Sequence, residues 1–167
     1  MAAEDRDPRD RQPGVAGQPL SIAKTSVDDK GRLKLPADFL AYLKALKVDK
    51  VFITTIDLQL ARIYPLSVWM SNENFFENAG ELASEAEEVS IIAKTYGGHA
   101  EIDSQGRVLM PSELRRLLEL ESEPVWIDFY NGAINVANRK VHEERMQRAK
   151  VNLGDKVKTL RKTGRLK

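Results

Sequence analysis

The sequence predicts an α+β fold in which two similar halves follow each other along the chain. Residues 28–36 read Asp-Asp-Lys-Gly-Arg-Leu-Lys-Leu-Pro, and residues 103–111, which lie 75 positions later, read Asp-Ser-Gln-Gly-Arg-Val-Leu-Met-Pro. Both copies have the form Asp-x-x-Gly-Arg-apolar-x-apolar-Pro. Because glycine favours a tight turn and proline favours the start of a helix, each copy is expected to place one arginine just beyond a loop tip. The second observation is that the same order of elements surrounds both copies.

The first half is expected to run strand, turn, strand, helix, hairpin. Strand-forming residues occupy positions 20–27 and 32–35, on either side of the first glycine turn. A helix is expected from Pro36, and it is expected to bury Phe39, Leu43 and Leu46, which stand at helical spacing. Two further strands, residues 51–55 and 60–64, are expected to form a hairpin around Asp57.

A helical insert is expected between the two halves. The segment Pro65-Leu66-Ser67 opens a first helix, which carries Trp69. Ser84 and Glu87 have the spacing of a capping box, so they predict the start of a second helix. That helix aligns Val89, Ile92 and Tyr96 and is expected to stop at Gly97-Gly98.

The second half repeats the first. Residues 99–103 lead into the second glycine turn, and residues 111–120 are expected to form the matching helix. Residues 125–130 and 133–137 flank Asn131-Gly132, a strong signal for a two-residue hairpin turn. The helix over residues 111–120 is expected to point Leu114, Leu117 and Leu118 inward. A last helix is expected over residues 139–150. Two such halves can complete one barrel-like sheet, whereas each alone leaves exposed strand edges.

The chain is therefore divided into four segments. Residues 1–19 mix prolines, glycines and charges without apolar periodicity, and they are predicted to be a disordered extension. Residues 20–96 form the first repeat with its helical insert, and residues 97–145 form the second repeat. Residues 146–167 form a basic tail.

Charge is distributed unevenly along the chain. Residues 145–167 hold nine Lys or Arg and one Asp, for a net charge of +8, while the whole chain carries only +1, so residues 1–144 carry −7. The basic tail is therefore either a nonspecific DNA arm or a solubilising tail. Any contact between the acidic remainder and a nucleic acid must use locally basic loops.

Composition excludes several classes of function. The sequence has no cysteine, which excludes disulfides and thiolate chemistry, and it has no run of eighteen apolar residues. The N-terminal sequence lacks the basic start and following apolar stretch of an export signal. We therefore expect a cytoplasmic protein without a membrane span. Motifs for a catalytic serine, a phosphate-binding loop or a dinucleotide site are absent, so we expect no enzyme, cofactor or metal. His99, Glu101 and Asp103 alternate on one strand face, but a structural role is favoured over metal binding.

The two glycine turns have the residues needed to bind DNA. Arg32 and Arg107 each carry a planar fork of donors that fits phosphate oxygens or the O6/N7 edge of guanine. Lys30 and Gln105 share one loop position and are weaker candidates, for phosphate or an adenine edge. Their alternative is a solvated turn, as it is for the arginines.

The remaining loop residues are assigned to scaffolding. Asp28 and Asp103 cannot contact phosphate favourably, so we expect them to accept hydrogen bonds from turn amides or to orient the arginine. Gly31 and Gly106 permit the turn. Lys34 aligns with Leu109, which is assigned to packing or to a subunit interface.

The sequence contains three longer motifs: Lys-Gly-Arg-Leu-x-Leu-Pro-Ala-x-Phe at residues 30–39, Tyr-Pro-Leu-Ser-x-Trp at residues 64–69, and Asp-Ser-Gln-Gly-Arg-Val-x-Met-Pro-x-x-Leu-Arg at residues 103–115. Together they resemble the MraZ family. The likeness extends over roughly residues 20–145. Leu40 is a departure, since the family usually has an arginine there.

The resemblance implies a pseudo-symmetric tandem of two AbrB/SpoVT-like halves that form a double-split β-barrel with flanking helices. It further implies a nucleoid-associated transcriptional regulator, a repressor of the division and cell-wall gene cluster. Such a protein binds direct repeats in promoter double-stranded DNA as a ring-shaped homo-oligomer. The alternative is an oligomeric interaction scaffold of the same fold that does not bind DNA.

Overall fold

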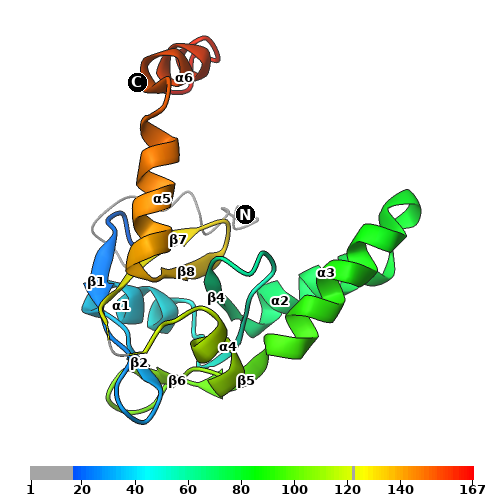
Figure 1. Ribbon diagram of the computed structural model, residues 1–167, viewed down its shortest axis with the longest axis vertical. Helices are drawn as coiled ribbons and strands as arrows, with labels where there is room; N and C mark the ends of the chain where they lie inside the picture. Colours follow the sequence, from blue (N-terminus) through cyan, green and yellow to red (C-terminus); the bar gives the residue numbers. More distant parts are fainter. Residues whose placement is uncertain (1–16, 122) are drawn as a thin grey trace, which may run out of the picture.

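The protein consists of a small β-rich body from which two helical segments project (Figure 1). The computed structural model describes residues 17–121 and 123–167. Within these residues, eight strands form the body: β1 Ala23–Thr25, β2 Arg32–Lys34, β3 Lys50–Thr54, β4 Ala61–Pro65, β5 Gly98–Glu101, β6 Arg107–Leu109, β7 Val125–Tyr130 and β8 Ala133–Ala137. The helices are α1 Ala37–Ala45, α2 Leu66–Glu77, the 3-10 turn η2 Gly80–Leu82, α3 Ala83–Tyr96, α4 Ser112–Leu117, α5 Arg139–Lys150 and α6 Leu153–Arg161. The predicted α+β class is confirmed.

The strands of the two halves are interleaved. Six strands form one antiparallel sheet in the order β1-β7-β8-β4-β3-β5, while β2 and β6 form a separate two-stranded ribbon. Exchanging each strand for its counterpart in the other half reproduces the same order. The first strand of each half pairs with a strand of the other half, β1 with β7 and β5 with β3. The predicted repetition of the element order is thus confirmed, and neither half completes its sheet alone.

The larger of two clusters of buried side chains joins the two halves. It contains four pairs of side chains separated by 75 positions, and each of these eight side chains is at most 4% exposed. The pairs are Leu33 with Val108, Leu35 with Met110, Phe39 with Leu114, and Leu43 with Leu118. Because both halves contribute matched side chains to one core, unfolding one half would expose the apolar face of the other.

One projection is the helical hairpin formed by α2, η2 and α3. Trp69 of α2 is 3% exposed and stacks on Phe52 of β3, with ring centroids 4.8 Å apart. The Thr54 hydroxyl donates a hydrogen bond of 2.7 Å to the Ala93 carbonyl oxygen of α3. These contacts fix the base of the hairpin to the sheet, while its tip extends away from the body (Figure 1).

The other projection is formed by α5 and α6. Asn138 caps α5, since its side-chain oxygen accepts a hydrogen bond of 2.8 Å from the backbone N–H of Val141. The Asn138 amide nitrogen donates 2.8 Å to the Leu118 carbonyl oxygen, which joins the start of α5 to the end of α4. Helix α6 lies beyond α5, at the end of the molecule opposite to the ribbon (Figure 1).

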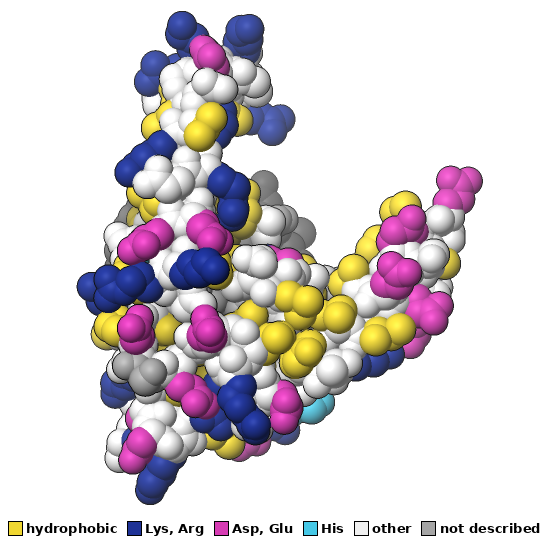
Figure 2. Space-filling model, viewed as in Figure 1, with side chains coloured by type: hydrophobic (Ala, Val, Ile, Leu, Met, Phe, Trp, Pro, Cys, Tyr) yellow, Lys and Arg dark blue, Asp and Glu magenta, His cyan; other side chains and the backbone are white. Residues whose placement is uncertain are grey.

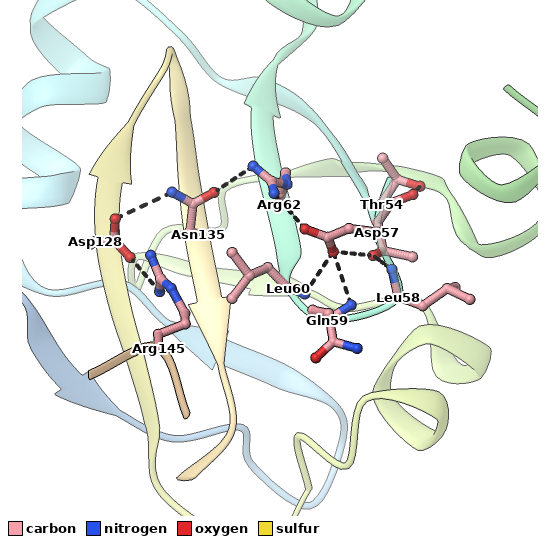
Figure 3. A network of polar contacts seen from close by, with 10 residues as sticks. Thr54, Asp57, Leu58, Gln59, Leu60, Arg62, Asp128, Asn135 and Arg145 are labelled. Carbon is pink, nitrogen blue, oxygen red and sulfur yellow. Dashed lines mark hydrogen bonds and ion pairs between the residues drawn. The ribbon is translucent and has the colours of Figure 1, made fainter. Parts of the chain in front are cut away.

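A row of polar contacts across the sheet holds α5 in place (Figure 3). Arg62 donates to Asp57 at 2.7 Å and to Asn135 at 3.3 Å. Asn135 in turn donates to Asp128 at 3.3 Å, and Arg145 of α5 donates to the same carboxylate at 3.3 Å. The row runs from the β3–β4 turn through β4, β8 and β7 to α5, so the direction of the projecting helix is set by the sheet.

Several sequence predictions hold at residue level. The Asn131-Gly132 turn is confirmed, since both residues have positive φ, +51° and +76°, and Tyr130 pairs with Ala133. Phe39 and Leu43 are buried as predicted, although Leu46 is only half-buried at the end of α1. The helix over residues 139–150 is confirmed as α5.

Two helix predictions are wrong. Leu117 was expected to point inward, but it is 41% exposed. Helix α4 was expected to reach position 120, but it ends at Leu117 because Glu119 takes a left-handed conformation with φ +51°. Ser84 does not cap α3: the helix begins at Ala83 with Leu82 at the N-cap position and without a side-chain cap. The preceding 3-10 turn leads directly into α3, so no capping box is formed.

The two ends of the chain add details that the sequence did not indicate. The predicted disordered extension falls outside the described residues up to position 16. At its end, Pro19 is buried. In the basic tail, helix α6 forms where no element was predicted.

Candidate nucleic-acid interface

The first glycine turn, residues 28–32, is closed by its own aspartate. One carboxylate oxygen of Asp28 accepts hydrogen bonds from the backbone N–H of Lys30 at 3.0 Å and of Arg32 at 2.9 Å. The Gly31 N–H donates 3.0 Å to the Asp28 carbonyl oxygen. Gly31 has φ +83°, a conformation that other residues rarely adopt. The turn is therefore specified by residues within five positions of the chain.

The second turn, residues 103–107, has the same geometry. Asp103 accepts from the backbone N–H of Gln105 and of Arg107, both at 2.9 Å. The Gly106 N–H donates 3.0 Å to the Asp103 carbonyl oxygen, and Gly106 has φ +75°. The sequence repeat is thus a repeat of backbone and side-chain hydrogen bonds.

Each aspartate also orients the arginine of its turn. Nε of Arg32 donates to the second oxygen of Asp28 at 2.8 Å, and Nε of Arg107 donates to Asp103 at 2.9 Å. The side chains of Arg32 and Arg107 are 29% and 22% exposed. The two guanidinium groups are accordingly held on the surface by equivalent bonds.

The hydrogen bonds also act on the carboxylates. The backbone N–H of Arg32 is the largest cause that lowers the pKa of Asp28, and the Arg32 side chain lowers it further. In the same way, the backbone N–H of Arg107 leads the causes that lower the pKa of Asp103. Both carboxylates therefore stay ionised at neutral pH and keep their arginines in place.

The β2–β6 ribbon carries the two turns at its opposite ends. Its register pairs Arg32 with Leu109, Leu33 with Val108, and Lys34 with Arg107. The central pair points into the core and is fully buried. Because side chains alternate along a strand, the two outer pairs lie on the opposite face. That face therefore presents three cations and Leu109, which is 56% exposed.

Among the weaker candidates, Lys30 and Gln105 are exposed at corresponding loop positions. Their backbone N–H groups are used by the turn, whereas Lys34 donates from Nζ to the Gln105 carbonyl oxygen at 2.7 Å. His99 packs edge-on against the Phe52 ring at 5.5 Å between centroids. In the described part of the chain, no group of three or more His, Asp or Glu is arranged to hold a metal ion. Nor is any helix there long and apolar enough to cross a membrane.

Comparison with known proteins gives the family. The chain is 33% identical to the transcriptional regulator MraZ of Acidobacterium capsulatum over 123 residues, which cover 74% of this chain and 84% of that protein. This chain belongs to the MraZ family. The MraZ of Koribacter versatilis is 33% identical over 63% of this chain and 72% of its own length, and that of Pediococcus pentosaceus is 30% identical over 81% and 91%. The chain matches no protein-family profile.

In this MraZ chain, sequence reasoning missed the residues that support each turn from the other half. A Cβ at Gly31 would lie 2.3 Å from the Arg115 guanidinium carbon, and a Cβ at Gly106 would lie 2.3 Å from Cδ1 of Leu40. Arg115 and Leu40 are themselves 75 positions apart, so they are counterparts in the repeat. Only that offset could have indicated the exchange, because nothing local to either helix points to the other half.

Arg115 is held firmly against the first turn of this MraZ protein. Its Nε donates 3.0 Å to the Met110 carbonyl oxygen, and its Nη1 lies 3.0 Å from a carboxylate oxygen of Glu121. At the second turn, Leu40 takes the place that Arg115 has at the first. The cation there is Lys34, whose Nζ donates a hydrogen bond to the Gln105 carbonyl oxygen of the turn. The first turn is therefore met by two cations of the second half, Arg115 at Gly31 and Arg107, whose Nη1 lies 4.0 Å from an Asp28 carboxylate oxygen, whereas the second turn is met by Lys34 of the first half.

Proposed function

We propose that this protein is a sequence-specific transcriptional regulator that binds promoter DNA through Arg32 and Arg107. Asp28, Gly31, Asp103 and Gly106 form the scaffold of the two loops. The observation that carries the proposal is that one ribbon presents two arginines held by the same hydrogen bonds to two carboxylates. A fixed guanidinium loses little side-chain entropy when it forms paired hydrogen bonds with the O6/N7 edge of guanine. Lys30 and Gln105 would add contacts to the DNA backbone beside it.

The family supports the biological setting of the proposal. Relatives named as transcriptional regulators make a DNA-binding regulator the expected class rather than an enzyme. We further propose a cytoplasmic, nucleoid-associated repressor of the division and cell-wall gene cluster. The halves at residues 20–96 and 97–145 would be AbrB-like repeats of a double-split β-barrel, a proposal supported by the interleaved strand order.

The proposed DNA-binding form is a ring-shaped homo-oligomer on direct repeats. One chain offers two arginine loops, a small number of base contacts for a specific site. Linking several copies raises the overall affinity through effective concentration without any new contact. Weak single contacts would then suffice for a tightly bound operator.

The test is a binding series with Arg32→Ala, Arg107→Ala and the double variant on fragments of the promoter. Each single change should weaken binding by about 1–3 kcal/mol if the lost contact is bidentate to guanine, and by less if it is to phosphate. Arg116→Ala is the matched control, since Arg116 has a 68% exposed side chain on α4 and belongs to neither loop. A folded double variant that binds as tightly as the unchanged protein would contradict the site. If the unchanged protein itself shifts no fragment at low salt, the scaffold alternative is favoured.

A further inference from the structure

The two projections of the molecule carry opposite charges (Figure 2). We name residues 66–96, which comprise α2, η2 and α3, the acidic hairpin, and residues 146–167 the basic arm. The acidic hairpin holds six Glu and one Lys, for a net charge of −5. The basic arm holds eight Lys or Arg and one Asp, for a net charge of +7. Figure 2 shows acidic side chains at the tip and outer side of the hairpin and basic side chains around the arm.

Both projections also expose large apolar side chains. On the acidic hairpin these side chains are 54–56% exposed, and they are Met70, Phe75, Leu82 and Ile91. On the basic arm they are 41–60% exposed, and they are Met146, Val151, Leu153, Leu160 and Leu166. A solubilising tail or an arm that only neutralises phosphates needs cations and no apolar surface. Apolar side chains surrounded by charge are typical of a protein contact.

The pattern on α6 defines one face of this contact. Leu153, Val157 and Leu160 stand at positions i, i+4 and i+7 and form one apolar stripe along the helix. Lys156 and Arg161 flank that stripe on its two sides by the same helical spacing. Lys158 of α6 and Lys162, the C-cap residue, lie on the opposite side of the helix by the same spacing.

A complementary pattern occurs on α3. Ala86, Ser90 and Ala93 are buried on the side of α3 that faces the rest of the protein. Ile91 lies on the outer side, and Glu87 and Glu88 precede it by four and three positions, so both carboxylates are its neighbours on the helix surface. The outer side of α3 thus offers an apolar side chain between acids, as α6 offers an apolar stripe between cations.

The two surfaces leave the body as separate projections, so the arm does not lie on the hairpin of its own chain (Figure 1). We propose that the basic arm of one copy docks on the acidic hairpin of a second copy of this chain. The proposal rests on the homo-oligomer part of the proposed function and names the surface that makes it. When the contact repeats head-to-tail from copy to copy, it generates a closed ring or an open filament.

The experiment measures the mass of the full chain by light scattering as a function of protein concentration. Lys156→Glu with Arg161→Glu reverses the cations beside the stripe, and Glu87→Lys with Glu88→Lys reverses the acids beside Ile91. Each pair should raise the concentration needed for assembly by about tenfold or more, because like charges then face each other. All four changes in one chain should restore assembly. Lys158→Glu with Lys162→Glu is the matched control on the far side of α6, and it should have a clearly smaller effect.

Circular dichroism of each variant shows whether the helices are kept. With the helices intact, failure of the fourfold variant to assemble would overturn the proposal. An equal loss of assembly in the Lys156→Glu/Arg161→Glu and Lys158→Glu/Lys162→Glu variants would overturn it as well. If the arm serves DNA instead, both α6 pairs will weaken DNA binding equally and leave the mass unchanged, which also overturns it. If the protein is a monomer in solution and its DNA binding still depends on Arg32 and Arg107, the docking is refuted and the proposed DNA contact stands. If the fourfold variant restores assembly but the protein does not bind DNA, the docking stands and the proposed DNA contact is refuted.

Discussion

Replacement of Gly106 with alanine tests how the second arginine loop is supported by the other half. Gly106 has φ +75°, and a Cβ there would lie 2.3 Å from Cδ1 of Leu40, well inside the ordinary contact distance of about 3.5–4.0 Å. Leu40 belongs to α1 of the first half and is half-buried. The substitution therefore combines backbone strain within the loop with a collision between the two halves.

The two contributions can be estimated separately. A left-handed conformation costs an alanine about 1–2 kcal/mol, and moving Leu40 out of its preferred rotamer costs about 1 kcal/mol. Gly106→Ala should thus lower the free energy of unfolding by about 2–3 kcal/mol. Gly132→Ala is the matched control, since Gly132 has φ +76° and its Cβ would meet only Val68 Cγ1 at 3.4 Å. That variant should lose only the strain of about 1–2 kcal/mol.

A double-mutant cycle isolates the collision. Leu40→Ala alone should cost about 1 kcal/mol for a half-buried leucine, and it removes the atom that the new Cβ would meet. The double variant should therefore be about 1 kcal/mol more stable than the sum of the single changes. The measurement is equilibrium urea unfolding of the four proteins at one protein concentration. Additivity within about 0.3–0.5 kcal/mol would refute the idea that Leu40 supports the loop.

Three further predictions concern a helix cap, pH and the operator. Asn138→Ala should cost about 1–2 kcal/mol in urea unfolding because α5 loses its cap, and Asn138→Asp, which keeps the cap acceptor, should still be destabilising because it loses the amide that donates to the Leu118 carbonyl oxygen. Burial raises the pKa of Asp57, but hydrogen bonds from Leu60, Gln59 and Arg62 outweigh it, so the net pKa is lowered. The resulting stability is present above about pH 4 and is lost as the pH falls, so Asp57→Asn should flatten the decline measured by urea unfolding between about pH 5 and pH 2. In gel shifts, an operator with direct repeats about 10 base pairs apart should lose most of its affinity when half a helical turn is inserted, whereas equal binding to one and to three repeats would contradict a multivalent protein.

The elements whose hydrogen bonds are local could be predicted from the sequence. In each arginine loop the aspartate, the glycine and the arginine lie within five positions, so their geometry follows wherever the motif occurs. The Asn131-Gly132 hairpin is local in the same sense. Phe39 and Leu114, each predicted to be buried by its own helix, are 75 positions apart and lie in the same core.

Tertiary structure decided how the halves combine. No periodicity within one half indicates that β1 pairs with β7, or that Arg115 packs on the loop of Gly31. Leu117 shows the limit, because its spacing fits an inward position but it is 41% exposed at the last position of α4. Local patterns fix which face of an element is apolar, whereas the partner of that face is selected by burying both halves in one core. That choice depends on contacts between residues far apart in the chain, which spacing within a segment does not record.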